Sequence, residues 1–291
     1  MAMASSTSVT WTALLTAWAR ARETRRPDAL FADPLAHRFL TAYAGEFGAD
    51  DDGGLPDLGP LSEHHSSPLW DYAIFGITMR TAVLDAAVRR SGQPQIVVLG
   101  AGLDTRPYRL GWSSEVTVFE VDRAVTLDFK AAVLSGAEPG CRRVPVVAEL
   151  GVDDLPQLLK TAGFDAGRPT LWLAEAVLFY LTAARADALL DDVGALSAPG
   201  SGLLAETLQR PYREDDLPVG QLTEADAAMW RGLVAAFAGG PEVTDPAAWL
   251  TARGWAPGEI TDQVAAGRAY GRPAPAFYEH VRDWIIEGHR A

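Results

Sequence analysis

The stretch Ile96-Val-Val-Leu-Gly-Ala-Gly102 joins a short apolar run to two glycines. A continuous run rich in β-branched residues is typical of a strand that is buried on both faces. Glycines directly after such a strand let the backbone turn sharply and approach a ligand closely. The stretch therefore predicts a central strand of a parallel sheet, with a ligand site at its carboxyl end.

Further apolar runs follow this strand, separated by segments of helix length. The runs are residues 116–121, 144–148, 170–174 and 202–205, and the intervening segments are residues 123–136, 153–162 and 182–197. Strand, helix and strand in units of about thirty residues imply right-handed crossovers between parallel strands. This pattern predicts an α/β fold with helices on both faces of a mostly parallel sheet.

The regions on either side of this core are less regular. Residues 8–47 indicate a helix, a turn and a short helix, residues 48–68 an exposed loop, and Pro68 opens a long helix that stops near Ser91-Gly92. Beyond residue 208 we expect helices at 223–238, 245–253 and 277–286, and an edge strand at 260–264. We therefore divide the chain into N-terminal helices that cover the active site (1–91) and an α/β domain (92–291) with a helical insertion at about 209–243.

The composition excludes several classes of partner. The chain has 38 acidic and 25 basic residues, so its net charge of −13 repels nucleic acid and anionic membrane surfaces. The single cysteine, Cys141, excludes an internal disulfide framework, and no group of residues has the spacing of a metal site. Because we find neither a signal peptide nor an apolar stretch of about 20 residues, we expect a cytoplasmic protein.

Acidic residues close the next three apolar runs: Glu120, Glu149 and Glu175. Ligands of parallel sheets bind beyond the carboxyl ends of the strands, and a carboxylate there can accept both hydroxyls of a ribose. A glycine turn followed by an acid at the end of the next strand is found in sites for both NAD and S-adenosylmethionine. Thr105 stands where a dinucleotide site would have its third glycine, and Glu149-Leu150 could recognise adenine through a carboxylate and a backbone N–H. Both features favour S-adenosylmethionine.

The segment Val97-Val-Leu-Gly-Ala-Gly-Leu-Asp-Thr-Arg-Pro-Tyr-Arg-Leu110 resembles the signature of the leucine carboxyl methyltransferase family. This family includes bacterial O-methyltransferases of the tetracenomycin polyketide type. Phe31-Ala-Asp-Pro34, Met79-Arg-Thr81, Phe119-Glu-Val-Asp122 and Ala174-Glu-Ala-Val-Leu-Phe-Tyr-Leu181 extend the resemblance over roughly residues 10 to 210. It implies a class I methyltransferase-like Rossmann fold, with a mostly parallel seven-stranded sheet, helices on both faces and an N-terminal helical cover.

The resemblance also implies a role for individual residues in binding S-adenosylmethionine and its product S-adenosylhomocysteine. Arg80 would hold the methionyl carboxylate, Glu120 the ribose, Glu149 with Leu150 the adenine, and Glu175 would lie near the methionyl amine. The remaining candidate cofactor-binding residues are Gly100, Ala101, Gly102, Thr105, Arg106, Val121 and Ala176. Glu149 departs from a frequent aspartate of the family, and Ala176 from a frequent glycine.

Two residues are candidates for the catalytic step. Tyr180 could place its hydroxyl over the transferred methyl group, and Arg20 could close over the site and meet an acceptor carboxylate. An ionised carboxylate acceptor requires no base, whereas a phenol would benefit from one, and His64-His65 is the one paired histidine motif. Glu206 closes the fifth apolar run without an assigned partner.

We therefore expect an S-adenosylmethionine-dependent O-methyltransferase that acts on a carboxylate or hydroxyl of a small molecule, in polyketide or other secondary metabolism. The alternative within this class is methylation of a protein's C-terminal leucine carboxylate. An NAD-dependent oxidoreductase and a non-catalytic cofactor-binding module represent other classes. The expected partner is a small-molecule acceptor, and the protein would be a monomer or homodimer. The identity of the acceptor and the need for a base stay open at this point.

Overall fold

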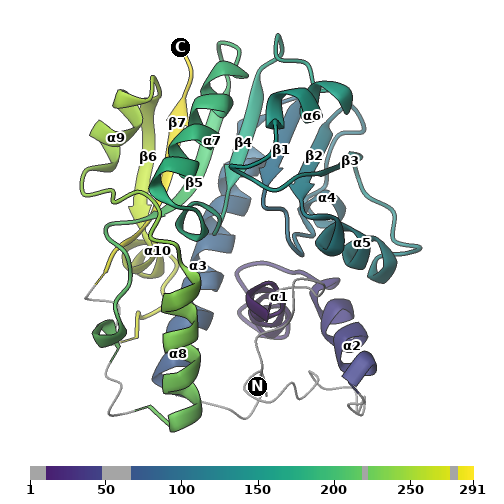
Figure 1. Ribbon diagram of the computed structural model, residues 1–291. Coiled ribbons are helices and arrows are strands. Elements are labelled where there is room, and N and C mark those ends of the chain that lie inside the picture. Colours follow the sequence, from purple (N-terminus) through teal and green to yellow (C-terminus); the bar gives the residue numbers. More distant parts are fainter. Residues whose placement is uncertain (1–10, 48–66, 218–221, 276–280) are drawn as a thin grey trace.

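One sheet organises the molecule, and its strands lie in the order β3-β2-β1-β4-β5-β7-β6 (Figure 1). The computed structural model describes residues 11–47, 67–217, 222–275 and 281–291. The first five strands run parallel, while β7 is antiparallel to both β5 and β6. The strands are β1 Gln95–Leu99, β2 Thr117–Asp122, β3 Arg142–Val147, β4 Thr170–Ala174, β5 Gly202–Leu208, β6 Ala256–Asp262 and β7 Asp283–His289.

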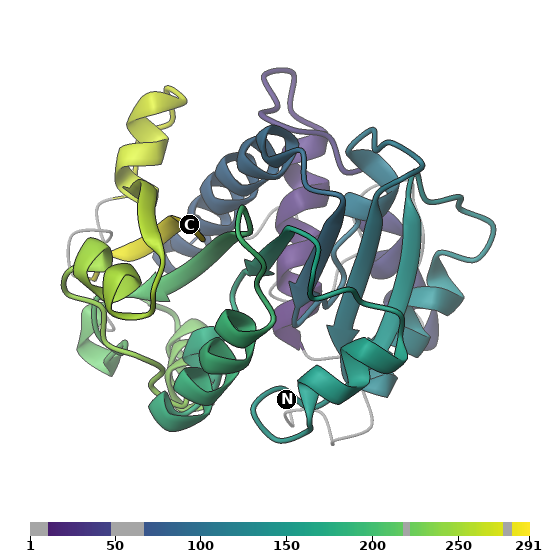
Figure 2. The ribbon, with the colours of Figure 1, turned by 90° about the horizontal axis from the view of Figure 1, so that it is seen from above.

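Helices cover both faces of this sheet (Figure 2). Side chains of α6, α7 and α9 share a core cluster with Val97 and Leu99, whereas side chains of α3 share another with Ile96 and Val98. Alternate residues of β1 thus serve opposite faces, as expected of a strand buried on both sides. The helices are α1 Trp11–Thr24, α2 Ala36–Phe47, α3 Pro68–Ser91, α4 Arg106–Arg109, α5 Ala124–Val133, α6 Leu155–Thr161, α7 Ala183–Ala195, α8 Glu224–Ala236, α9 Pro246–Ala252 and α10 Gln263–Ala269, with 3-10 turns η2 Leu178–Tyr180 and η3 Glu214–Asp216.

The long helix α3 begins and ends where the sequence predicts. Ser67 caps its first turn by accepting a hydrogen bond from the Trp70 amide, and Pro68 occupies a position where no amide donor is needed. Gly92 ends the helix in the left-handed conformation, with φ of 60°. Among the described helices, α3 included, none has the length and apolar content needed to cross a membrane.

The N-terminal helices α1 and α2 lie at the edge of the sheet where the parallel strands end (Figure 1). Their apolar side chains form a separate core cluster with the start of α3 and with α8, built around Trp18, Phe39, Trp70 and Trp230. The predicted helix, turn and second helix within residues 8–47 are therefore confirmed. Of the predicted loop at 48–68, residues 48–66 lie outside the described residues.

The C-terminal region corrects one prediction. A helix was expected over residues 277–286, but residues 283–289 form β7, paired with β5 from Gly202 opposite His289 to Leu208 opposite Asp283. Ile285 and Ile286 enter the core clusters on opposite faces of the sheet. A short apolar run buried on both sides cannot be assigned to helix or strand by periodicity. The predicted edge strand lies at 256–262 as β6, and the helix α10 after it was not predicted.

Gly240 provides a test of how η2 is held in place. Its φ of +59° is left-handed, and a Cβ there would lie 2.8 Å from the Phe179 Cα and 2.9 Å from the Leu178 carbonyl oxygen. We expect Gly240→Ala to lower the free energy of unfolding by about 1–3 kcal/mol, measured by urea denaturation. Gly232→Ala in α8, where no atom lies within 4 Å, should instead stabilise by about 0.5–1 kcal/mol. Equal effects of the two variants would contradict this assignment.

Candidate functional site

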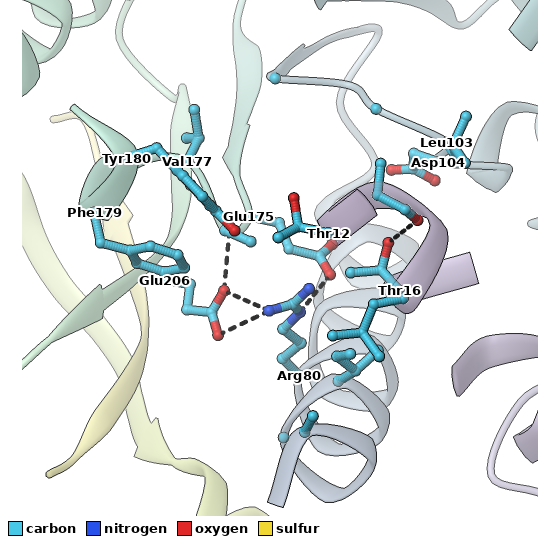
Figure 3. Close-up of a pocket in the computed structure, with 18 of the residues that line it drawn as sticks. Thr12, Thr16, Arg80, Leu103, Asp104, Glu175, Val177, Phe179, Tyr180 and Glu206 are labelled. Atoms are coloured by element: carbon cyan, nitrogen blue, oxygen red, sulfur yellow. Dashed lines mark hydrogen bonds and ion pairs between the residues drawn. The ribbon is translucent and has the colours of Figure 1, made fainter. Parts of the chain in front are cut away.

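A cavity of about 480 Å³ lies where the parallel strands end. One side, the glycine-turn half, is formed by residues 100–104, Asp122 and Arg123. The other side, the aromatic half, is formed by Tyr72, Tyr180, Tyr212, Trp230 and Phe237. Helix α1 supplies Thr12, Thr16 and Arg20 to the same lining, and Figure 3 shows several of these side chains around Arg80.

The glycine turn is fastened to the end of the neighbouring strand. Gly100 and Gly102 both have positive φ, and a Cβ on Gly100 would lie 3.0 Å from Val177 Cγ2. The Ala101 amide donates to the Val121 carbonyl, and the Gly102 amide donates to Asp122 Oδ2 at 2.7 Å. The backbone thus approaches the cavity without side chains in the way, next to a carboxylate from β2.

A buried network of charges separates the two halves. Arg80 lies between two carboxylates (Figure 3), donating from Nε to Glu175 at 3.0 Å and from Nη1 to Glu206 at 3.3 Å. Arg106 donates from Nη1 to Glu175 and to Asp104, both at 2.7 Å. Although burial alone would raise it, Arg106 and Arg80 hold the pKa of Glu175 below its ordinary value. Glu175 therefore carries a negative charge at the centre of the site.

Two further acids on the aromatic side have the opposite shift. Glu206 accepts from the Ala176 amide and from Gln263 Nε2, each at 3.0 Å, and burial raises its pKa despite Arg80. Asp283 accepts a 2.5 Å hydrogen bond from the Tyr212 hydroxyl. Burial and the nearby Glu206 raise the pKa of Asp283 to about 8. A carboxyl group with such a pKa can exchange protons near neutral pH.

The aromatic half is a cluster of rings in edge-on contact. Tyr212 lies at its centre, with ring centroids 6.2 Å from Tyr72, 5.5 Å from Trp230 and 5.7 Å from Phe237. Tyr180 adds a further contact to Phe237 at 4.9 Å. The Tyr72 hydroxyl donates to the Tyr212 hydroxyl at 2.5 Å, so a polar chain runs through the apolar cluster to Asp283.

Most of the site residues predicted from the sequence come together around this cavity. The residues that line it are Arg20, Arg80, Gly100, Ala101, Gly102, Arg106, Glu175, Ala176 and Tyr180. Thr105 and Val121 are fully buried outside its lining. Arg109 Nε donates to the Thr105 hydroxyl, and Val121 holds the turn through its carbonyl, so both support the turn from behind.

Glu120, the predicted ribose ligand, lies away from the cavity lining. Its carboxylate has no exposed surface and is bonded to Lys130 Nζ at 2.6 Å and to Arg143 Nε. The carboxylate that β2 presents to the cavity belongs to Asp122, two residues further along. The sequence motif contained Asp122, but the predicted strand ended one residue before it.

Glu149 and Leu150 also lie outside the cavity lining. Glu149 is exposed, and its amide donates to Asp153 Oδ2 at 2.8 Å. Leu150 is buried and packs near Gly100, whose added Cβ would lie 3.9 Å from Leu150 Cδ1. The structure therefore places Leu150 behind the glycine turn and gives Glu149 no contact with the described cavity wall.

The two candidate catalytic residues both reach the cavity. Arg20 is engaged by Asp33 at 2.8 Å and by the Leu103 carbonyl at 2.7 Å, so it ties α1 to the glycine turn. Tyr180 lies on η2. Burial raises its pKa, although a hydrogen bond with Thr12 acts in the opposite direction. His64 and His65, the histidines considered as a possible general base, lie outside the described residues.

Ala176 has a backbone conformation that explains the family preference noted above. Its φ of 50° is left-handed, which is unusual for a residue with a Cβ. The same conformation directs its amide toward Glu206 Oε2. The frequent glycine would adopt this turn without strain, so Ala176 is tolerated at a small energetic cost.

Except for Tyr180, the residues of the aromatic half and the acids beside it were not predicted as site residues from the sequence. Tyr72, Tyr212 and Gln263 had no predicted role, and Asp283 fell in a segment expected to be helical. The signal that could have found Asp283 is an acid directly before the apolar run Trp284-Ile-Ile286, had that run been assigned to a strand. Tyr72 and Tyr212 carry no comparable local signal, because they lie on α3 and on the loop after β5, which are far apart in the sequence.

Comparison with known proteins now adds to this geometry. The family model described as "Leucine carboxyl methyltransferase" matches residues 13–194. The chain belongs to the leucine carboxyl methyltransferase family. A Streptomyces coelicolor relative named "Putative S-adenosyl-L-methionine-dependent methyltransferase" is 43% identical over 257 residues, covering 84% of this chain and 80% of the relative. A Parafrankia relative with the same description is 38% identical, covering 98% of this chain and 88% of its own.

Solved structures agree with the fold of this family. A DUF574-family protein from Streptomyces avermitilis has a TM-score of 0.53 at 15% identity, covering 95% of this chain and 97% of its own. A Thermobifida fusca protein titled a "putative methyltransferase" has the same TM-score at 18% identity, covering 98% and 97%. The predicted class I methyltransferase-like fold is confirmed. As a family member, the chain is a methyltransferase with S-adenosylmethionine as its methyl donor.

The raised pKa of Asp283 has a consequence for folding. Between about pH 4 and pH 8 the folded protein keeps a proton on Asp283 that the unfolded chain has lost, so this residue makes stability fall as pH rises. As pH rises over this range, we expect the free energy of unfolding to fall less for Asp283→Asn than for the wild type. Urea denaturation at several pH values measures this difference. Asp191→Asn, on the exposed face of α7, is the matched control. A pH dependence unchanged by Asp283→Asn would contradict the shift.

Proposed function

We propose that this protein transfers the methyl group of S-adenosylmethionine to a carboxylate or hydroxyl oxygen of a small molecule. The observation that carries the proposal is the cavity that joins the glycine turn to the half-buried aromatic half. Its volume of about 480 Å³ lies within the range of small-molecule sites. Enclosure between α1, α3 and α8 suits a free small molecule better than the end of a folded protein.

The glycine-turn half fits the methyl donor. Asp122 lies beside the Gly102 amide at the end of β2, where a carboxylate can accept both ribose hydroxyls. Contacts with described residues use Nε and Nη1 of Arg80, which leaves Nη2 for the methionyl carboxylate. The negative charge of Glu175 favours the cationic methionyl amine.

The remaining residues of the cavity would prepare the transfer. When bound, the donor supplies a methyl group on a positively charged sulfur, which an oxygen attacks in line. Tyr180 and Phe179 come from the loop after β4, next to Glu175, and thus border both halves of the cavity. The rings would exclude water from the bound acceptor and hold it in one orientation, which is the main requirement for a displacement of this kind. A role in polyketide or other secondary metabolism stays a prediction from the family resemblance.

Asp122 and Glu120 form a matched pair for testing the donor site. We expect Asp122→Asn to weaken S-adenosylhomocysteine binding by about 1.5–3 kcal/mol, measured by calorimetry, because a carboxylate that accepts ribose hydroxyls is lost. Glu120→Gln should leave this affinity within about threefold but lower the free energy of unfolding by about 3–5 kcal/mol, because Lys130 and Arg143 lose their shared partner. The reverse pattern would return the ribose site to Glu120.

The proposed reaction is tested by incubating the protein with methyl-labelled S-adenosylmethionine and a panel of aromatic compounds. The panel contains hydroxyl, carboxyl, amino and thiol groups on the same ring system, and mass spectrometry identifies the methylated atom. We expect label on oxygen alone, because a hydroxyl or carboxyl group can form hydrogen bonds with the carboxyl, amide, tyrosine and arginine groups that line the cavity. Label found on nitrogen or sulfur would overturn the O-methyltransferase assignment and leave the methyl donor intact.

A further inference from the structure

One wall of the cavity consists of hydrogen-bond acceptors. This polar wall is formed by Glu206, Gln263 and Asp283, which come from β5, α10 and β7. Gln263 is 2% exposed and donates through Nε2 to Glu206, which fixes the orientation of its amide. Among the described residues, Gln263 Oε1 has no hydrogen-bond partner although it is buried. A buried acceptor of this kind is costly unless a ligand donates to it.

The cations near this wall are already paired. Arg80 contacts Glu206 of the wall. Both Glu206 and Glu175 accept its hydrogen bonds. Arg20 is bound by Asp33, while Arg106 and Arg109 are bound by Asp85. Above about pH 8, where Asp283 is mostly ionised, a ligand carboxylate at the wall would face this negative charge and could donate no hydrogen bond. A neutral hydroxyl could donate to the same acceptors.

The rest of the aromatic half indicates the shape of the ligand. The rings of Tyr72, Tyr212, Trp230 and Phe237 form one cluster beside the wall. Clusters of this kind favour flat aromatic ligands, which pack against ring faces and edges. The Tyr72 and Tyr212 hydroxyls lead through this cluster to Asp283, with each oxygen 2.5 Å from the next.

We propose that the methyl acceptor is a hydroxyl group on a flat aromatic ring, bound at the polar wall, and that Asp283 takes its proton through Tyr72 and Tyr212. This inference rests on the proposed function and selects one of its two acceptor classes. The O–CH₃ bond forms as the S–CH₃ bond breaks, and that electron pair stays on sulfur. For the transfer, the hydroxyl turns its O–H from the wall to the Tyr72 oxygen. Its proton passes to Tyr72, the proton of Tyr72 passes to Tyr212, and the proton of Tyr212 passes to Asp283.

The surroundings of Asp283 suit this role. Glu206 on β5, Tyr212 on the loop after β5, Arg80 on α3 and Asp262 at the end of β6 are the charged and titratable groups that act on it. Burial, Glu206 and Asp262 raise its pKa to about 8, while Tyr212 and Arg80 act in the opposite direction. A base with a pKa near the working pH and below that of a phenol is effective in general base catalysis.

The acceptor class is tested with 2-naphthol and 2-naphthoate, which share a ring system and differ in the polar group. Calorimetry at about pH 8 on protein saturated with S-adenosylhomocysteine should give 2-naphthol an affinity at least about tenfold higher. Asp283→Asn should narrow this preference by strengthening 2-naphthoate binding, whereas Asp191→Asn should change neither affinity. Tighter binding of 2-naphthoate, or no binding of 2-naphthol, would overturn the inference.

The proton path is tested by single-turnover methylation of 2-naphthol. We expect Asp283→Asn and Tyr212→Phe to slow the reaction by about 10²–10⁴-fold and Asp283→Asn to abolish its rise with pH near 8, with donor affinity unchanged. Tyr270→Phe, an exposed tyrosine outside the cavity, should react at the wild-type rate. Rates within about threefold of wild type, or a wild type that does not methylate 2-naphthol, would refute the path.

The two proposals fail in different ways. Absence of S-adenosylhomocysteine binding by the wild type would contradict the donor site and with it the proposed function. Normal donor binding with a preference for 2-naphthoate would leave the O-methyltransferase assignment in place and contradict the hydroxyl acceptor alone.

Discussion

The buried carboxylate of Glu175 is the point on which the arrangement of the site depends. It closes β4 and is bonded to Arg80 of α3 and Arg106 of α4, so one side chain joins three elements. Buried charges of this kind are costly to separate, because removing one partner leaves the others without compensation. Asp85 extends the network by holding Arg106 and Arg109. Helix packing around the cavity is thereby fixed by paired charges as well as by apolar contacts.

The same network connects the N-terminal helices to the sheet. Asp33, which follows α1, accepts from Arg20, whose guanidinium also donates to the Leu103 carbonyl of the glycine turn. Arg109 lies 3.8 Å from the same Asp33 carboxylate. Helix α1 is thus attached to the glycine turn. Binding of a ligand at the glycine turn could therefore shift α1 through these contacts of Arg20.

The sequence was sufficient to predict the fold and most of the glycine-turn half, because these depend on local signals. Strand β1, the two glycines and the boundaries of α3 each follow from neighbouring residues. Periodicity alone does not show that Lys130 and Arg143 enclose Glu120. Asp283, Tyr72 and Tyr212 had no predicted role, because their proximity arises from long-range packing and from the antiparallel β7. Local patterns carry no record of such contacts.

The antiparallel direction of β7 brings a residue from near the end of the chain to the cavity. A strand running against its neighbours brings its first residue, Asp283, to the edge where the others bring their last. The family model ends at residue 194, whereas Glu206, Tyr212, Gln263 and Asp283 all lie beyond it. If the proposed acceptor site is right, substitutions in this later segment would change the substrate without altering the glycine turn, which lies within the matched residues. Relatives that share the first part need not share a substrate.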